Sequence, residues 1–199
     1  MASIQIPNLP VAIALSGTEE VEVVQAGVSC RSTTQQIANL APAADSSRGY
    51  YGAFYDTTTQ TGSLTASLVN IGTVGEANNI SLSSGGRITF LAAGTYSISF
   101  SIQLTNFDNN VIHDADIWLK KNGSNVANSN SRFDIHGKHS GQDGATIGTV
   151  DFLMTFSAND YVELFWLVDN VNVKISTLAA VGSVPQTPGV ILNVINVRV

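Results

Sequence analysis

Hydrophobic and polar residues alternate along much of the second half of the chain, from residue 87 to residue 199. A repeat of two residues is typical of a β-strand with one face toward a core and the other toward solvent. In the segment 95–105 every second residue is apolar: Tyr96, Ile98, Phe100, Ile102 and Leu104. The residues between them are Thr, Ser and Gln. The pattern therefore predicts antiparallel β-sheet.

Similar segments follow one another, separated by turns rich in Gly, Asn and Asp. Asn122-Gly123 is the strongest two-residue hairpin signal, and it would join strands over 114–121 and 124–133. Other strands are expected over residues 52–56, 64–71, 80–82, 87–91, 146–156, 161–169 and 190–199. About eight short strands with frequent turns indicate a sandwich. The expected fold class is all-β: an antiparallel jelly-roll β-sandwich with a small N-terminal module of extended chain, hairpin and short helix.

Two of the expected strands, 161–169 and 190–199, are apolar on both faces. The outer face of a monomeric sandwich meets water, so this surplus apolar surface needs a cover. Either the chain's own loops or another subunit could provide it, and about 1,000 Å² of apolar contact per subunit would suit a permanent oligomer. We favour the subunit and predict an interface at Tyr161, Phe165, Leu167, Leu192 and Val194.

The N-terminal residues, up to about 41, differ from this pattern. Pro7 and Pro10 favour an extended start, and alternation over 20–24 and then 28–31 predicts a hairpin. Thr33 and Gln36 fit a capping box for a short helix over 34–40. The module has too few large apolar residues to form an independent core. We therefore expect it to dock on another protein or on its symmetry mates. The expected docking residues are Ile4, Ile6, Leu9, Val21, Val23, Ile37 and Leu40.

The segment 42–51 is small, polar and punctuated by Pro and Gly, as linkers are. The expected organisation is therefore an N-terminal module over 1–41, a linker over 42–51 and a jelly-roll head over 52–199.

Composition narrows the class of protein. The chain is 44% hydrophobic but only 12% charged, against roughly 25% charged in average soluble proteins, so Ser, Thr, Asn and Gln must keep it soluble. A net charge of −6 argues against nucleic-acid binding. The single cysteine, Cys30, excludes an intrachain disulfide. We expect neither a signal peptide nor membrane insertion, because Pro7 and Pro10 interrupt the N-terminal apolar stretch, and folding should take place in a reducing cytosol.

Candidate chemistry is sparse. Asp134, His136 and His139 lie close together in a glycine-containing segment; a transition metal could use them, but we expect a solvated loop that faces a receptor. The segments 108–110 and 113–116 offer oxygen ligands for calcium, although Asn and Asp are also ordinary turn formers. No nucleophile elbow or phosphate-binding motif occurs. We expect no cofactor and no enzyme activity, with polysaccharide cleavage as the remaining alternative.

Three motifs in the head resemble a known family. Gly94-Thr-Tyr96-Ser-Ile-Ser-Phe100, the hairpin Asp116-Ile-Trp-Leu-Lys-Lys-Asn-Gly123 and the turn and strand Ser157-Ala-Asn-Asp160-Tyr-Val-Glu-Leu164 are similar to motifs of the tumour necrosis factor and complement-head jelly rolls. Asn159 stands where that family usually has Gly. The segment Pro185 to Leu192 resembles versions of this domain in bacteriophage fibre-like proteins. The resemblance covers roughly residues 52–199.

The N-terminal module also resembles a known type of sequence. Leu15-Ser-Gly17-Thr-Glu19 through Gln25-Ala-Gly27, followed by Thr33-Thr-Gln-Gln-Ile37-Ala-Asn-Leu40, is similar to modules at the start of phage tail and head-fibre proteins. Together the two resemblances imply a homotrimer on the virion surface, made in the cytoplasm of a host bacterium. The N-terminus would bind other virion proteins of the capsid or tail, and the head would project outward as a short fibre, head fibre or capsid-decoration component. The alternative is a trimeric module that binds a host glycan or protein receptor for adsorption.

Overall fold

The computed structural model describes residues 14–39, 49–83 and 85–197. The chain divides into two compact units, Met1–Ser46 and Ser47–Val199. The division falls within the segment 42–51 that the sequence suggests as a linker. Four of the predicted docking residues lie outside the described residues: Ile4, Ile6, Leu9 and Leu40.

In the first unit, a hairpin and one turn of helix follow each other as expected. β1 (Glu20–Gln25) pairs antiparallel with β2 (Val28–Thr33), and α1 (Thr34–Ala38) follows directly. The predicted capping box is present: the Gln36 amide donates to the Thr33 hydroxyl at 3.1 Å, and the Thr33 amide donates to the Gln36 side chain at 2.9 Å. Local sequence signals therefore decide the structure of this unit.

Glu19 ties the approach to β1 to the start of α1. Its carboxylate accepts hydrogen bonds from the Ser16 hydroxyl, the Gly17 amide and the Thr34 hydroxyl. These bonds, first of all those from Ser16, hold the pKa of Glu19 well below its usual range. None of residues 14–39 is buried; Val21 and Val23 are half-buried, and Ile37 is exposed. The described part of the module thus has no core of its own.

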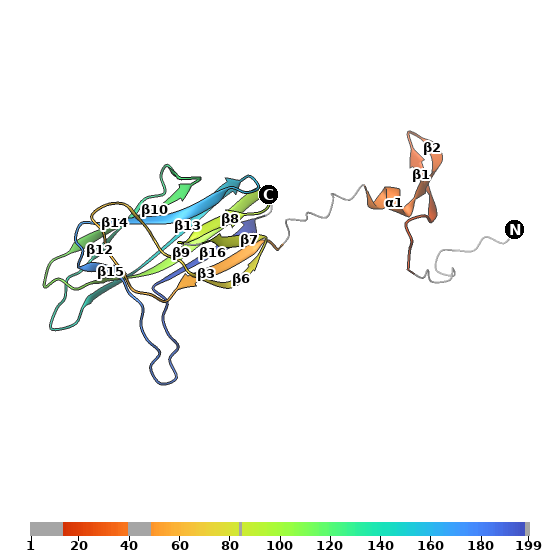
Figure 1. The fold of residues 1–199 in the computed structure, drawn as a ribbon. Helices are drawn as coiled ribbons and strands as arrows, with labels where there is room; N and C mark the ends of the chain where they lie inside the picture. Colours follow the sequence, from red (N-terminus) through yellow and green to blue (C-terminus); the bar gives the residue numbers. More distant parts are fainter. Residues whose placement is uncertain (1–13, 40–48, 84, 198–199) are drawn as a thin grey trace. The chain divides into compact units, whose positions relative to one another are not determined.

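The second unit is a sandwich of two antiparallel sheets, each of seven strands (Figure 1). In the first sheet the main strands are, in spatial order, β6 (Thr73–Asn78), β3 (Tyr51–Asp56), β16 (Val190–Val197), β9 (Gly94–Asn106) and β13 (Gly144–Phe156). The short β15 (Val173–Ile175) also pairs with β9, and β4 (Gln60–Thr61) pairs with β15.

The second sheet contains β7 (Ile80–Ser83), β8 (Arg87–Phe90), β14 (Tyr161–Val168), β10 (His113–Lys121) and β12 (Ser131–Ile135) in that order. The short β11 (Ser124–Asn125) pairs with β10, and β5 (Ser67–Leu68) pairs with β14. From β8 to β15 the chain crosses repeatedly from one sheet to the other. This arrangement confirms the predicted all-β jelly-roll sandwich.

A single hydrophobic core fills the space between the sheets. The alternation seen in the sequence is confirmed on β9, where Tyr96, Ile98, Phe100, Ile102 and Leu104 are all buried. On β14 one of the two apolar faces is buried as well, with Val162, Leu164, Trp166 and Val168. Alternation therefore identified the inner face of β9, whose opposite face is polar.

The sequence predicts too few strands, since the described residues of the second unit contain fourteen rather than about eight. β6 was missed because its sequence, Thr-Val-Gly-Glu-Ala-Asn, lacks apolar alternation and lies at a sheet edge. The expected strand over 64–71 forms only at β5, although Val69 and Ile71 still reach the core. The expected strand over 124–133 is divided, because a loop over 126–130 separates β11 from β12.

Two residues predicted for a subunit interface belong to the core instead. Leu192 and Val194 are 1% and 0% exposed. β16 lies between β3 and β9, and its even-numbered residues point toward the other sheet. Ile191, Ile195 and Val197 form the outer face. Because both faces of this strand are apolar, the alternation could not show which one was inside.

Candidate functional site

The residues predicted to face a receptor lie together at one end of the sandwich. Asp134 is in β12, and His136 and His139 are in the loop that follows. All three are exposed, and His139 Nδ1 lies 3.4 Å from Asn110 Oδ1. In residues 14–39, 49–83 and 85–197, no group of three or more His, Cys, Asp and Glu residues is arranged to hold a metal ion.

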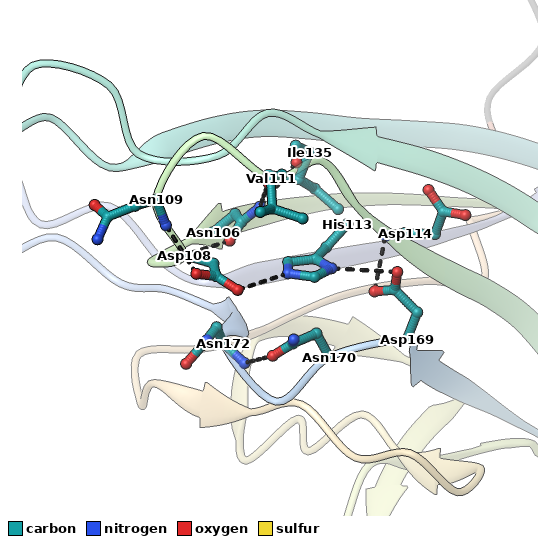
Figure 2. Close-up of polar contacts among 10 residues, drawn as sticks. All are labelled: Asn106, Asp108, Asn109, Val111, His113, Asp114, Ile135, Asp169, Asn170 and Asn172. Atoms are coloured by element: carbon teal, nitrogen blue, oxygen red, sulfur yellow. Dashed lines mark hydrogen bonds and ion pairs between the residues drawn. The ribbon is translucent and has the colours of Figure 1, made fainter.

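The third histidine forms a more organised site. His113, at the start of β10, is only 7% exposed, and its ring lies between two carboxylates (Figure 2). Nε2 is 3.1 Å from Asp108 Oδ2, and Nδ1 is 3.2 Å from Asp169 Oδ2. The second Asp169 oxygen accepts the backbone amide of Asp114 at 3.0 Å. We call Asp108, His113 and Asp169 the histidine clasp.

The clasp favours a doubly protonated imidazole, because a carboxylate can only accept and both ring nitrogens must then donate. Burial lowers the pKa of His113, but the hydrogen bonds to Asp108 and Asp169 outweigh it and raise the pKa above its ordinary value. In return, the hydrogen bond from His113 lowers the pKa of Asp108. With both nitrogens occupied, the ring has no free lone pair with which to act as a general base.

Asparagine side chains extend the clasp into the neighbouring loops. Asn106, which is fully buried, donates to the backbone carbonyls of Val111 and Ile135 at 2.9 and 3.0 Å. Its side-chain oxygen accepts the Asp108 amide at 2.9 Å. The network therefore fastens the β9–β10 loop to β12 and, through Asp169, to the end of β14. These hydrogen bonds hold the three segments together.

Sequence reasoning found only part of this network. The segments 108–110 and 113–116 were considered as calcium ligands, but the partner that explains His113 is Asp169, which lies 56 residues away in sequence. No sequence motif near His113 predicts its contact with Asp169.

On the outer face of β14, the predicted interface residues Tyr161, Phe165 and Leu167 are half-buried within their own domain. The Arg87 guanidinium lies 3.9 Å from the centre of the Tyr161 ring. The Lys120 ammonium lies 3.9 Å from the centre of the Phe165 ring. These cation–π contacts cover the two rings from within the chain, but the cations come from strands β8 and β10 and not from the loops that the sequence suggests as the alternative cover.

The outer face of the first sheet is different, and we call it the apolar face. Leu153, Ile147 and Ile195 are 68%, 63% and 58% exposed. Between their strands runs β9, whose outward residues are Thr, Ser and Gln. Ser97, for example, lies in register between Leu153 and Ile195. The result is a row of small polar side chains flanked by exposed aliphatic ones. β16 has an apolar outer face, as expected, but Ile191 and Ile195 form it rather than the predicted Leu192 and Val194.

Two further features adjoin the apolar face. β13 pairs with β9 over all 13 of its residues and with no other strand in the described part of the chain, although the Thr146 hydroxyl donates to the Asp134 carbonyl of β12 at 3.3 Å. A hairpin over residues 176–189 projects from the sandwich between β15 and β16 (Figure 1). It contains no charged residue, and Leu178, Val181 and Val184 are 60%, 73% and 62% exposed.

Comparison with known proteins gives little beyond the fold. No protein-family model matches the sequence, and neither does any curated protein. Among solved structures, the globular domain of zebrafish complement 1qA is similar over 75% of this chain and 98% of its own length, with 9% identity and a TM-score of 0.45. Within the described residues, no helix is both long and apolar enough to span a membrane.

Proposed function

We propose that this chain is a non-enzymatic structural protein of a bacteriophage virion, a homotrimeric short fibre, head fibre or capsid-decoration component. Its N-terminal module would dock on the particle, and its jelly-roll head would project outward at the virion surface. The observation on which the proposal mainly rests is the apolar face of the first sheet.

The apolar face supports self-association on physical grounds. Monomeric soluble proteins rarely leave large contiguous apolar patches in water. The nearest acid on β13, Asp151, already accepts a hydrogen bond from Ser97 at 2.8 Å, which reduces its demand for water. The edge of β13 beside the patch has no second strand partner among the described residues, and such an edge needs protection from uncontrolled pairing. A partner subunit would cover both, and the motif resemblance described above favours three-fold assembly.

The N-terminal module supports attachment to something larger. Its described residues have no buried core, yet the hairpin and capped helix are well defined by hydrogen bonds. Its motifs are similar to those at the start of phage fibre proteins. Docking would bury Val21, Val23 and Ile37, of which Ile37 is 41% exposed.

Light scattering and particle incorporation test the proposal. We expect the full chain to have three times the mass of its 20.9 kDa monomer at micromolar concentration. We also expect a truncated chain lacking residues 1–46 to keep that stoichiometry but to be lost from particles. A stable monomer would overturn the trimer, and full incorporation of the truncated chain would overturn the docking role.

A second candidate function is a trimeric receptor- or glycan-binding module for host adsorption. The observation that favours it is a groove on the second sheet, lined by Trp118 and several asparagines.

A further inference from the structure

The outer face of the second sheet carries a groove of about 400 Å³, which neither the core nor the histidine clasp uses. Its base is formed by Trp118 of β10 and Leu167 of β14, and its wall by the loop 126–130 and its neighbours. This volume lies within the range of about 300–1,000 Å³ that is usual for small-ligand sites. We propose that this groove, the Trp118 groove, binds a neutral carbohydrate.

The groove is preorganised by a buried serine. Ser129 is 1% exposed, and its hydroxyl accepts the Leu119 amide at 3.0 Å and donates to the Val126 carbonyl at 2.8 Å. The Val126 amide in turn donates to the Leu119 carbonyl at 2.9 Å. These bonds fix the loop on β10, so a ligand would not have to order it.

Trp118 is oriented to offer its ring rather than its N–H. Indole Nε1 donates to Asn125 Oδ1 at 2.9 Å, which satisfies the only polar group of the side chain. Trp118 is half-buried, and its edge toward β14 packs on Phe165, with ring centres 6.1 Å apart. A flat apolar surface beside polar groups suits the C–H face of a sugar ring.

The polar lining matches hydroxyl groups. Asn125 keeps its amide N–H₂ as a donor, since only its oxygen is engaged by Trp118. Asn130 keeps its oxygen as an acceptor, since its N–H₂ donates to Asp116 at 2.8 Å. The Asn128 side chain has no hydrogen bond to the rest of the described chain, so it can both donate and accept. A sugar hydroxyl also does both.

Charge and topology argue for a neutral sugar over other ligands. Asp116, the only acid in the groove, is paired with Arg132 at 2.8 Å, so the site has little net charge to attract an ion. An extended peptide would usually add to a sheet edge, but β10 is paired on both sides, with β14 and with β11 and β12. A nucleic acid would need unpaired cations for its phosphates.

This inference deepens the second candidate function, because it names the site and the ligand class of a receptor-binding head. It does not depend on the trimer, since every lining residue belongs to one chain and lies in β10, β11, β14 or the loop 126–130. Failure of self-association would therefore leave the groove intact, and failure of sugar binding would leave the proposed virion role untouched.

Intrinsic fluorescence provides a direct test with the full chain. The protein has two tryptophans, and Trp166 is only 2% exposed, so a ligand in the groove should change the emission of Trp118 alone. The probes are a glycan array and then methyl glycosides of glucose, galactose, mannose and N-acetylglucosamine. We expect saturable binding of at least one neutral glycan, accompanied by a change in emission.

Three variants locate the site. Trp118→Ala, measured on the glycan array because it removes the fluorescent reporter, should weaken binding by tenfold or more, on the order of one lost aromatic contact. Asn128→Gly, which keeps the positive φ of 62° but removes the amide, should weaken it by about fivefold, as expected for one hydrogen bond. The matched control is Asn159→Gly, which makes the same change at a φ of 69° in a turn outside the groove and should leave affinity unchanged.

If Trp118→Ala does not fold, as judged by circular dichroism, Asn128→Gly still decides the question. Absence of binding to every neutral glycan would overturn the proposal. So would binding that both groove variants leave unchanged, or binding of anionic glycans or peptides only.

Discussion

The two outer faces of the sandwich differ in how they treat their apolar residues. On the second sheet, Tyr161 and Phe165 lie under Arg87 and Lys120, so cations of the same chain cover the rings. On the first sheet, Leu153 and Ile195 are more than half exposed, and the neighbouring β9 contributes only small or neutral polar side chains. On the second sheet, side chains of the same domain cover the aromatic rings, whereas on the first sheet the aliphatic side chains remain exposed.

This difference indicates which outer face of the sandwich binds another subunit. A face whose charges are already paired gains little from another protein surface, because those pairs would have to be desolvated. A face with exposed aliphatic residues, on which the one acid of β13, Asp151, already accepts a hydrogen bond, gains from burial at roughly 25 cal/mol per Å² of apolar area. We therefore assign self-association to the first sheet and ligand binding to the second.

The largest expected effect comes from placing charge on the apolar face. The double change Leu153→Glu and Ile195→Glu should dissociate the oligomer, because two carboxylates on each subunit would have to be buried without partners. Light scattering should then give the monomer mass of 20.9 kDa. Leu64→Glu, at a residue that is 60% exposed but lies outside this face, is the control. An oligomer that survives the double change would refute the assignment.

The next effect separates the two faces of β16. Leu192→Ala should lower the free energy of unfolding by about 2–5 kcal/mol, because it opens a cavity in the core. Ile191→Ala, on the outer face, should change it by less than about 1 kcal/mol. Urea denaturation would measure both, in the background of the dissociated double variant so that self-association does not contribute. Equal effects at the two residues would contradict the observed orientation of β16.

A smaller effect concerns the histidine clasp, which links loops between the two sheets. Because the pKa of His113 is raised in the folded state, its contribution to stability is complete below the unfolded value of about 6.5. That contribution is lost as the pH rises through the raised folded value. NMR titration should place the pKa of His113 above 6.5, and Asp108→Asn should lower it. A pKa below 6.5 in the unaltered protein would show that burial outweighs the two carboxylates.

The smallest effect concerns the turn that carries the chain from β13 in the first sheet to β14 in the second. Asp160 accepts hydrogen bonds from Asn122 and from the Ser157 amide, and pairs with Lys121. The bond from Asn122 makes the largest contribution in lowering the pKa of Asp160 to about 2. The contribution of Asp160 to stability should therefore be present above about pH 4 and be lost as the pH falls toward 2. Melting temperatures from pH 5 to pH 2 should fall less steeply for Asp160→Asn, and identical slopes would exclude this role.

Much of the fold could be predicted because its signals are local. Alternation located β9, β10, β13 and β14, and Thr33 with Gln36 located the start of α1. Where local signals were weak, the prediction failed: β6 has no apolar alternation, and the loop 126–130 interrupts what looked like one continuous strand. Both errors lie at or near the edge of a sheet, where fewer contacts constrain the sequence.

The candidate sites were harder to predict because they join distant segments. Asp134, His136 and His139 are close in sequence, but they are not among any group of three or more side chains arranged to hold a metal ion in the described residues. His113 and Asp169 form one across 56 residues. The Trp118 groove likewise joins β10, β14 and a loop whose position depends on the single buried hydroxyl of Ser129.

By itself, the sequence determined the strand periodicity, the cap of the short helix and hence the all-β class, since each depends on residues a few positions apart. Only the tertiary structure decided which face of β16 is inside, because a strand that is apolar on both faces satisfies the same alternation in either orientation. It also decided which apolar surfaces are covered within the chain and which remain open. Whether an apolar side chain is covered depends on residues that are close in space but distant in sequence. Arg87, for example, covers Tyr161 from a different strand.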